Sequence, residues 1–332
     1  MAERQSRPNL GEFEMIARYF APLADKFPGA LNLKDDAALI AVTPGRELAV
    51  TTDALVAGVH FLPDDPPDLI ARKLLRVNLS DLAAMGATPL AYLLIAVFTK
   101  NTPEDWIAAF AEGLAADQAS FRIALCGGDT VAANGPLTLA VTALGEIDVG
   151  KALRRSTAGE GDVVYVSGSI GDAVLGLAVL RGSLPGLGAG SRDWAVGRYR
   201  LPQPRVELGR RLVGLATSAI DVSDGLIADL GHVCVASGVG AVIEVDSVPL
   251  SPACREALAL GGIAWDDLIS GGDDYELLFT VPAARVAALA AVARDTGLIL
   301  TPIGRIVGGS GVRVVDAGGR DVTPPTSGYR HF

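Results

Sequence analysis

Cysteine, histidine and aromatic side chains are scarce in this sequence. Its 332 residues include three cysteines and three histidines, and only 5% of them are aromatic. No two cysteines have the CxxC spacing of a zinc site, and three dispersed thiols do not make a disulfide framework. These shortages exclude small zinc-binding and disulfide-stapled folds, and they indicate a reducing compartment.

Motifs of the common ATP-using folds are missing as well. The sequence has no GxxxxGK[ST] phosphate-binding loop, no HRD or DFG kinase element, and no evident Ser-His-Asp or Cys-His arrangement. Residues 168–172, GSIGD, match the dinucleotide pattern GxGxxG only weakly, so a Rossmann site is a minor alternative. An ATP-using enzyme with this sequence would belong to another architecture.

Positive charge and uninterrupted apolar segments are also limited. The formal net charge is -10, which disfavours nucleic acids and anionic membranes as partners. The longest apolar region, 82–98, is broken by Gly86 and Pro89 and is a poor membrane span. The first residues, MAERQSRPNLGEFE, lack the apolar core of a signal peptide, so we expect a cytoplasmic protein.

What the sequence does contain is apolar aliphatic residues in α/β patterns. Half of the residues are hydrophobic, and the chain is long enough for two domains. The charged stretch KALRRSTAGEGD at 151–162 predicts the boundary between a domain at 1–150 and one at 151–332. Apolar patterns predict helices at 69–85 and 224–235, strands at 89–98, 121–126 and 163–167, and a C-terminal hairpin.

The stretch LAVTTDALVAGVHF at 48–61 changes from an apolar run to polar residues at Thr51, Thr52 and Asp53. On an extended backbone Thr51 and Asp53 point to one side and Thr52 to the other. Their oxygens are ligands of the kind that hold Mg²⁺. A turn at the end of a strand, with the aspartate as a helix cap, is the alternative.

Acidic residues take comparable positions elsewhere in the chain. Asp36 precedes an apolar run, Asp81 lies on the apolar stripe of the predicted helix, and Asp129 follows Gly127-Gly128, two glycines that let the backbone approach a ligand closely. Asp221 and Asp224 follow another apolar run, in AIDVSDGL. Solvated turns and helix caps are the alternatives for each of them.

Convergence of these carboxylates would require cations. Two like charges 4 Å apart repel by about 4 kcal/mol at an effective dielectric constant near 20. Divalent ions remove this repulsion, and hard oxygen ligands select Mg²⁺ or Mn²⁺ over zinc. A polyphosphate is the natural substrate for several Mg²⁺ ions beside glycine-rich segments.

Several motifs together resemble the thiamine-monophosphate kinase family of the aminoimidazole-ribonucleotide synthetase superfamily. They are KDDAALI, TTDALVAGVHFL, VNLSDLAAMGATP, CGGDT, RRS, AIDVSDGLIADLGH, SGGDDYELLFTV and GYRHF. The resemblance implies a two-domain α/β fold whose N-terminal sheet forms a barrel in a homodimer. It also implies that ATP phosphorylates thiamine monophosphate to thiamine diphosphate.

The resemblance also implies roles for particular residues. Several Mg²⁺ ions would bind Asp36, Thr51, Thr52, Asp53, Asp81, Asp129, Asp221 and Asp224, with Asp53, Asp81 and Asp129 acting in catalysis through the metal. ATP would contact Gly128, Asp129, Arg155 and Ser223, and thiamine monophosphate would contact His60, Asp273 and Tyr329. Two residues depart from the family pattern: Lys34 replaces a usual glycine, and Asp273 replaces a common glutamate.

The acceptor in this reaction is an ionised phosphate oxygen, so we expect direct in-line transfer without a general base. Two alternatives remain. One is another enzyme of the superfamily, such as a selenophosphate or purine-pathway synthetase. Selenophosphate synthetases carry a reactive cysteine near the N-terminus, whereas the first cysteine of this sequence is Cys126. The other is a non-catalytic regulator that binds metal or nucleotide.

Overall fold

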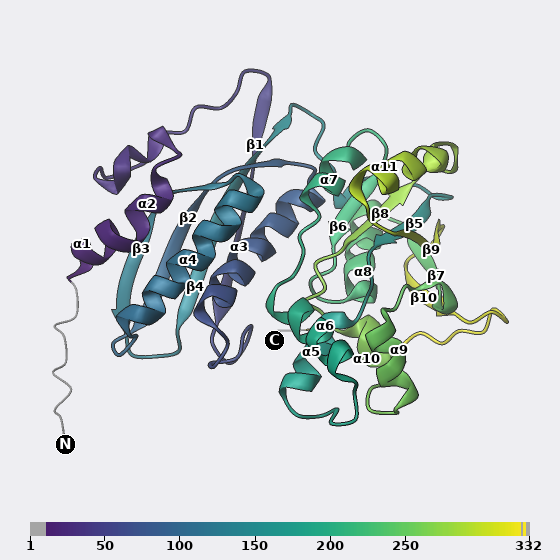
Figure 1. Cartoon of the computed structure of the whole chain (residues 1–332). Coiled ribbons are helices and arrows are strands. Elements are labelled where there is room, and N and C mark those ends of the chain that lie inside the picture. The colour runs from purple at the N-terminus through teal and green to yellow at the C-terminus, as the bar shows by residue number, and fades with distance from the viewer. Residues whose placement is uncertain (1–10, 327, 330–332) are drawn as a thin grey trace. The chain divides into compact units, whose positions relative to one another are not determined.

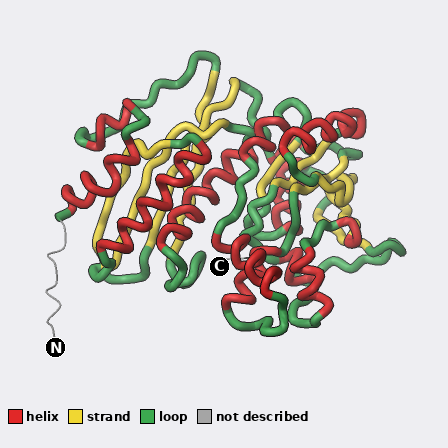
Figure 2. The backbone as a smooth tube through the Cα atoms, viewed as in Figure 1, coloured by secondary structure: helices red, strands yellow, loops and turns green. Residues whose placement is uncertain are grey.

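The structure is a computed structural model that describes residues 11–326, 328 and 329. It has the mixed α/β architecture that the sequence predicts, with two sheets and flanking helices (Figures 1 and 2). The described residues form two compact units: one contains those up to Thr43, Val50–Asn78 and Pro89–Leu144, and the other contains Pro44–Ala49, Leu79–Thr88 and those from Gly145 onward. In this described part of the chain, no helix is both long and apolar enough to cross a bilayer.

Most of a four-stranded sheet belongs to the first unit. Its strands, in spatial order, are β1 (Arg46–Val56), β4 (Thr138–Asp148), β2 (Thr88–Thr99) and β3 (Ala124–Ala133). Short helices α1 (Glu12–Met15) and α2 (Ala21–Ala24) precede it, and the long helices α3 (Pro67–Ala84) and α4 (Glu104–Phe121) lie on one face (Figure 1). The predicted helix at 69–85 and strand at 89–98 are confirmed.

The strand predicted at 121–126 has other bounds in the structure, because β3 begins at Ala124 and continues through Gly127 and Gly128, which excludes the alternative of a turn there. β3 pairs in parallel with β2, with Leu94 opposite Gly128 and a register shift just before, at Tyr92/Leu93. A Cβ atom on Gly128 would lie 1.9 Å from the Leu94 carbonyl oxygen. Glycine is therefore required here for the close approach of two strands rather than for a turn.

The second unit is built on a six-stranded mixed sheet. Its strands, in spatial order, are β10 (Gly311–Val315), β7 (Gly240–Glu244), β9 (Leu300–Val307), β5 (Val163–Ser167), β8 (Leu277–Val281) and β6 (Ser218–Asp221). Its helices are α5 (Asp172–Leu180), α6 (Ala189–Arg200), α7 (Val206–Leu212), α8 (Leu226–Ser237), α9 (Pro252–Ala259), α10 (Trp265–Ser270) and α11 (Leu289–Thr296). The predicted strand at 163–167 is confirmed. The C-terminal hairpin is present only as an isolated antiparallel bridge between Val315 and Asp321, and β10 itself pairs in parallel with β7.

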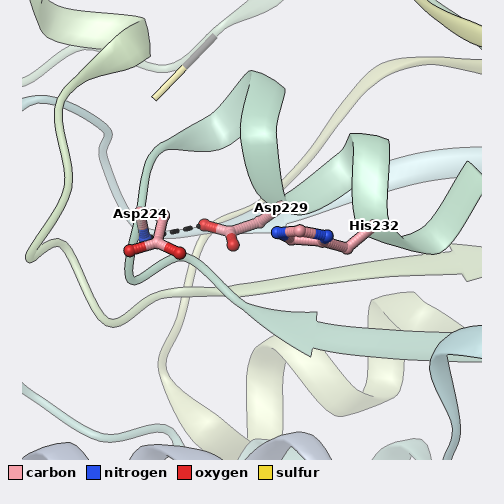
Figure 3. A group of neighbouring side chains, drawn as sticks. All are labelled: Asp224, Asp229 and His232. Atoms are coloured by element: carbon pink, nitrogen blue, oxygen red, sulfur yellow. Dashed lines mark hydrogen bonds between the residues drawn. The ribbon is translucent and has the colours of Figure 1, made fainter. Parts of the chain in front are cut away.

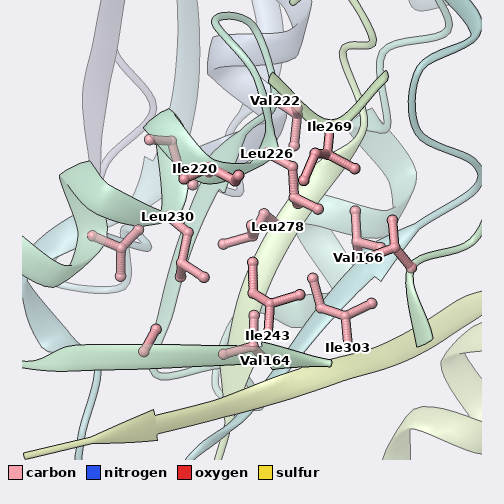
Figure 4. Close-up of a cluster of buried hydrophobic side chains, with 14 of the residues drawn as sticks. Val164, Val166, Ile220, Val222, Leu226, Leu230, Ile243, Ile269, Leu278 and Ile303 are labelled. Atoms are coloured by element: carbon pink, nitrogen blue, oxygen red, sulfur yellow. The ribbon is translucent and has the colours of Figure 1, made fainter. Parts of the chain in front are cut away.

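Both faces of this sheet are buried. On one face Val166, Ile220 and Leu278 pack with Leu226 and Leu230 of α8, which explains why these apolar runs have no polar alternation (Figure 4). On the other face Tyr165 and Phe279 stack with ring centroids 5.6 Å apart, and α7 and α11 cover them. The core therefore fixes β6 and α8, and with them the polar segment that connects the two.

Candidate active site

A cavity of about 240 Å³ in the first unit brings together three predicted site residues. Asp36, Gly128 and Asp129 line it, with Asp35 as a further carboxylate. Asp36 and Asp129 are exposed, and Asp129 is held in position by β3. The cavity therefore offers carboxylate oxygens beside a strand whose glycines permit close approach of a ligand.

The side chains of β1 alternate as the sequence predicts. Thr51 and Asp53 are half-buried, whereas Thr52 between them is exposed. The Thr52 hydroxyl donates to the Val141 carbonyl oxygen at 3.1 Å and accepts from the Thr142 hydroxyl at 3.1 Å. Thr52 is thus part of the pairing between β1 and β4, and it lies on the face opposite to Asp53.

His60 is held at the end of the same strand. The Val56 amide donates to its Nδ1 at 3.1 Å, and Lys73 Nζ donates to its carbonyl oxygen at 3.0 Å. An Nδ1 that accepts a hydrogen bond belongs to a neutral imidazole with its proton on Nε2. His60 can therefore offer a ring N–H donor to a polar ligand.

In the second unit, Asp221 and Asp81 form a repulsive pair. Asp221, the last residue of β6, is only 2% exposed. Burial and then the Asp81 carboxylate raise the pKa of Asp221 well above its usual value, and the Ser80 hydroxyl and the Arg155 charge oppose this only partly. Three of the predicted residues, Asp81, Arg155 and Asp221, therefore act on one another electrostatically.

The segment between β6 and α8 gathers the other predicted residues of this unit. The Asp273 amide donates to the Ser223 carbonyl oxygen at 2.8 Å, and the Tyr329 amide donates to the Asp224 carbonyl oxygen at 2.9 Å. These two bonds place Asp273 beside Ser223, a predicted ATP contact, and Tyr329 beside Asp224, a predicted metal ligand. The remaining residues of the GYRHF motif, 330–332, lie outside the described residues.

The two departures from the family pattern have different structural consequences. Lys34 has φ -110°, which any residue adopts, so a glycine is not needed there. Asp273 has φ +71°, a left-handed conformation that aspartate tolerates better than most residues. Its Oδ1 accepts a hydrogen bond from the Tyr275 hydroxyl at 3.2 Å, which orients the carboxylate.

The weak dinucleotide motif at 168–172 is not a phosphate site. The amides of Gly171 and Ala173, at the start of α5, donate to the Asp274 carboxylate at 2.7 and 3.3 Å. Asp274 is 1% exposed, so these donors are already paired inside the protein. The chain fills this helix start with its own carboxyl group, so these amides are not available to a dinucleotide phosphate.

Sequence reasoning missed Asp229 and His232 on α8, although the motif AIDVSDGLIADLGH contains both. The Asp229 carboxylate accepts hydrogen bonds from the amides of Ser223, Asp224 and Gly225, and side-chain ligand atoms of Asp224, Asp229 and His232 lie within 4.8 Å of one another (Figure 3). Burial and then the Asp224 charge raise the pKa of Asp229 to about 7. The signal in the sequence was an acidic residue on the inner face of a predicted helix.

The predicted residues thus fall into two sets, each within one unit. The first unit holds Asp36, Thr51, Thr52, Asp53, His60, Gly128 and Asp129. The second unit holds Asp81, Arg155, Asp221, Ser223, Asp224, Asp273 and Tyr329. The second set fits divalent cations, because it contains carboxylates that are buried or close to one another, and burial and mutual repulsion disfavour their charged forms.

The raised pKa of Asp229 predicts the pH dependence of stability in metal-free buffer. Between the usual value of 3.8 and about 7, the folded chain holds a proton that the unfolded chain has released. The free energy of unfolding should therefore fall as pH rises through this window, by roughly 4 kcal/mol at most from this group. Thermal unfolding at several pH values with a chelator measures this, and Asp229→Asn should flatten the profile. Parallel profiles for the two proteins would contradict the assignment.

Comparison with known proteins gives consistent matches over nearly the whole chain. Residues 34–147 match the family described as AIR synthase related protein, N-terminal domain, and residues 159–317 match the corresponding C-terminal domain. The thiamine-monophosphate kinase of Caulobacter vibrioides is 42% identical over 332 residues, which cover 96% of this chain and 90% of that protein.

Two solved structures are similar in fold as well as in sequence. The thiamine-monophosphate kinase of Stenotrophomonas maltophilia has a TM-score of 0.83 and 44% identity, with 92% of this chain and 96% of that chain covered. AaThiL complexed with AMPPCP and TMP has a TM-score of 0.77 and 29% identity, with both chains fully covered.

Proposed function

This chain belongs to the AIR synthase related family and, within it, to the thiamine-monophosphate kinases, and from that premise we propose how its residues perform the reaction. The enzyme phosphorylates thiamine monophosphate with ATP to give thiamine diphosphate and ADP. The observation that supports a nucleotide site best is the joining of Ser223, Asp224, Asp273 and Tyr329 by backbone hydrogen bonds in one part of the second unit.

We assign Mg²⁺ binding to the predicted carboxylates and hydroxyls of both units. They are Asp36, Thr51, Thr52, Asp53, Asp81, Asp129, Asp221 and Asp224. The strongest support is Asp221, because a carboxyl group that is 2% exposed beside another acid is stable in its charged form only with a cation. When bound, Mg²⁺ would neutralise the triphosphate and the charge that develops during transfer.

The remaining residues would bind and orient the two substrates. Gly128, Asp129, Arg155 and Ser223 would contact ATP, with Arg155 supplying an exposed guanidinium for phosphate oxygens. The neutral His60 ring, the Asp273 carboxylate and the Tyr329 ring would contact thiamine monophosphate. Because the acceptor phosphate is already ionised, the protein has to align two phosphates rather than remove a proton, and transfer is direct and in-line.

We further propose that the enzyme is a homodimer formed through the four-stranded sheet. On β2 and β3, Leu93, Ile95 and Val131 are 38%, 47% and 44% exposed. Leu93 and Ile95 alternate along β2 with Phe98, whose ring contacts Trp106 of α4, so they point away from that helix. A row of exposed aliphatic side chains on one sheet face is typical of a surface covered by a second copy. This surface would be the barrel interface that the sequence predicts, with 1–150 as the nucleotide-binding and dimerisation domain and 151–332 as the second domain.

The dimer proposal predicts the effect of a charge on this face. Ile95→Asp should convert a dimer to a monomer, because a buried unpaired carboxylate is strongly unfavourable in an interface. Light scattering after gel filtration measures the mass. As a control, Leu260→Asp places the same charge at a half-exposed leucine outside this sheet. Leu260 is 53% exposed at the end of α9, and the variant should keep the wild-type mass. A monomeric wild-type protein would contradict the proposal.

The activity is tested by incubating the protein with Mg²⁺, ATP and thiamine monophosphate. ADP and thiamine diphosphate should appear together in equal amounts. ADP without thiamine diphosphate would favour another enzyme of the superfamily, and bound ATP without any product would favour a regulator. We place the enzyme in the cytoplasm, where ATP is available and where its three cysteines, which are buried and free, stay reduced.

A further inference from the structure

The segment Val222–Gly225, which we name the acidic turn, connects β6 to α8 and carries Ser223 and Asp224. It belongs to no helix or strand. Its four carbonyl oxygens accept backbone hydrogen bonds from the amides of Tyr275, Asp273, Tyr329 and Asp229. The Val222 amide donates to the Glu276 carbonyl oxygen. The other three amides of the turn require acceptors too, because buried or half-buried N–H groups are costly when they are left unpaired.

One carboxylate oxygen supplies these acceptors. Asp229 Oδ2 accepts from the amides of Ser223, Asp224 and Gly225 at 3.0, 3.1 and 3.1 Å. The Asp229 side chain is 2% exposed, and Figure 3 shows it directed from α8 toward the acidic turn. Loss of this one acceptor would leave three amides without a partner, so one side chain holds three consecutive residues.

This arrangement differs from an ordinary helix cap. A capping side chain comes from the residue before a helix and bonds to amides of the first turn. Asp229 lies inside α8 and reaches back to three residues that precede it, so its effect falls on the acidic turn rather than on the helix. Oδ2 already has three donors, so the contact with the turn accounts for its position.

We propose that Asp229 is a positioning residue that holds the acidic turn in the conformation in which Ser223 and Asp224 bind ATP and metal. The assignment of ATP and metal to Ser223 and Asp224 rests on the proposed function, whereas the ordering of the turn by Asp229 does not. Asp229 acts through the backbone of its neighbours and touches no reacting atom. Loss of its carboxylate should therefore loosen the turn and weaken nucleotide binding without removing a ligand.

Three variants separate this role from a general contribution to stability. Asp229→Ala removes the acceptor, and Asp229→Asn keeps one uncharged oxygen acceptor of the same size. Val233→Ala is the matched control, because Val233 is fully buried on the same helix and its truncation destabilises packing without touching the three hydrogen bonds. The asparagine variant keeps the test decisive if the alanine variant does not fold.

The first measurement is hydrogen exchange of the amides of residues 223–225 in ligand-free protein. We expect exchange to be about tenfold faster or more in Asp229→Ala than in the wild type, with a smaller increase in Asp229→Asn. In Val233→Ala these amides should change no more than the rest of α8. Wild-type exchange rates at the three amides in both Asp229 variants would overturn the proposal.

The second measurement is calorimetric titration with Mg²⁺ and a non-hydrolysable ATP analogue. The Kd should rise by about tenfold to a hundredfold in Asp229→Ala, rise less in Asp229→Asn, and stay at the wild-type value in Val233→Ala. An unchanged Kd in both Asp229 variants would overturn the role in ligand binding. If the wild type itself binds no analogue, the proposed function fails, and the exchange rates still decide whether Asp229 orders the turn.

Discussion

Asp53→Ala should lose almost all turnover while the protein stays folded. Asp53 is half-buried on β1, where it is assigned to Mg²⁺, and the other carboxylate of this strand, Glu47, accepts a hydrogen bond from the Gly150 amide at 2.9 Å. Removal of one group that stabilises the charge of a transferring phosphate costs on the order of 10² to 10³ in kcat. Because Asp53→Ala also removes a metal ligand, we expect the decrease in kcat to lie at the upper end of this range. Initial rates at saturating Mg²⁺, with a thermal unfolding curve, measure both effects.

A second acidic residue at a sheet strand provides the control for Asp53. Asp148 ends β4 and pairs with Arg46 at 3.4 Å, and its side chain is 68% exposed. An exposed pair of this kind contributes little to stability, and Asp148→Ala should keep wild-type kcat. Near-wild-type activity of purified Asp53→Ala would refute its assignment as a metal ligand.

Gly128→Ala should damage both the sheet and the cavity that Asp36 and Asp129 line. An added Cβ would lie 1.9 Å from the Leu94 carbonyl oxygen. The backbone φ angle at this position is +153°, a value that residues with a side chain rarely adopt. The strands β2 and β3 would have to separate at the point where Asp129 lines the cavity. We expect a loss of roughly 3 kcal/mol in the free energy of unfolding, with activity lost as well. Denaturant titration and the coupled assay for ADP measure the two.

The neighbouring glycine is a matched control because its surroundings can yield. A Cβ on Gly127 would lie 3.0 Å from the Leu93 Cδ2 atom, which is the end of a partly exposed side chain. Gly127→Ala should therefore cost much less stability than Gly128→Ala and should retain activity. Equal losses in the two variants would show that the close approach at Leu94 is not the reason for glycine.

The sequence predicts the elements with long apolar patterns well and the segments with competing signals poorly. The strand at 163–167 and the helix at 69–85 are right, because an uninterrupted apolar run or stripe has one burial solution. The strand predicted to end at Cys126 continues through Gly127-Gly128, where a turn was the alternative. Glycine is permissive in both settings, and only the partner strand, about thirty residues away in sequence, decides between them.

The candidate site shows the same division. The alternation of Thr51, Thr52 and Asp53 followed from strand geometry alone, and the structure has it. The role of Asp229 could not be read in this way, because a carboxylate on the inner face of a helix predicts burial but not which amides it meets. That information depends on how the chain turns between β6 and α8, where no periodic pattern exists.

The most direct test of the metal-centred account is a crystal structure with Mg²⁺, a non-hydrolysable ATP analogue and thiamine monophosphate bound. The account predicts metal ions bound to Asp53 and to the Asp81 and Asp221 pair, with the terminal phosphate of the analogue facing the phosphate of the second substrate. All three carboxylates without metal, with the analogue bound elsewhere, would contradict it.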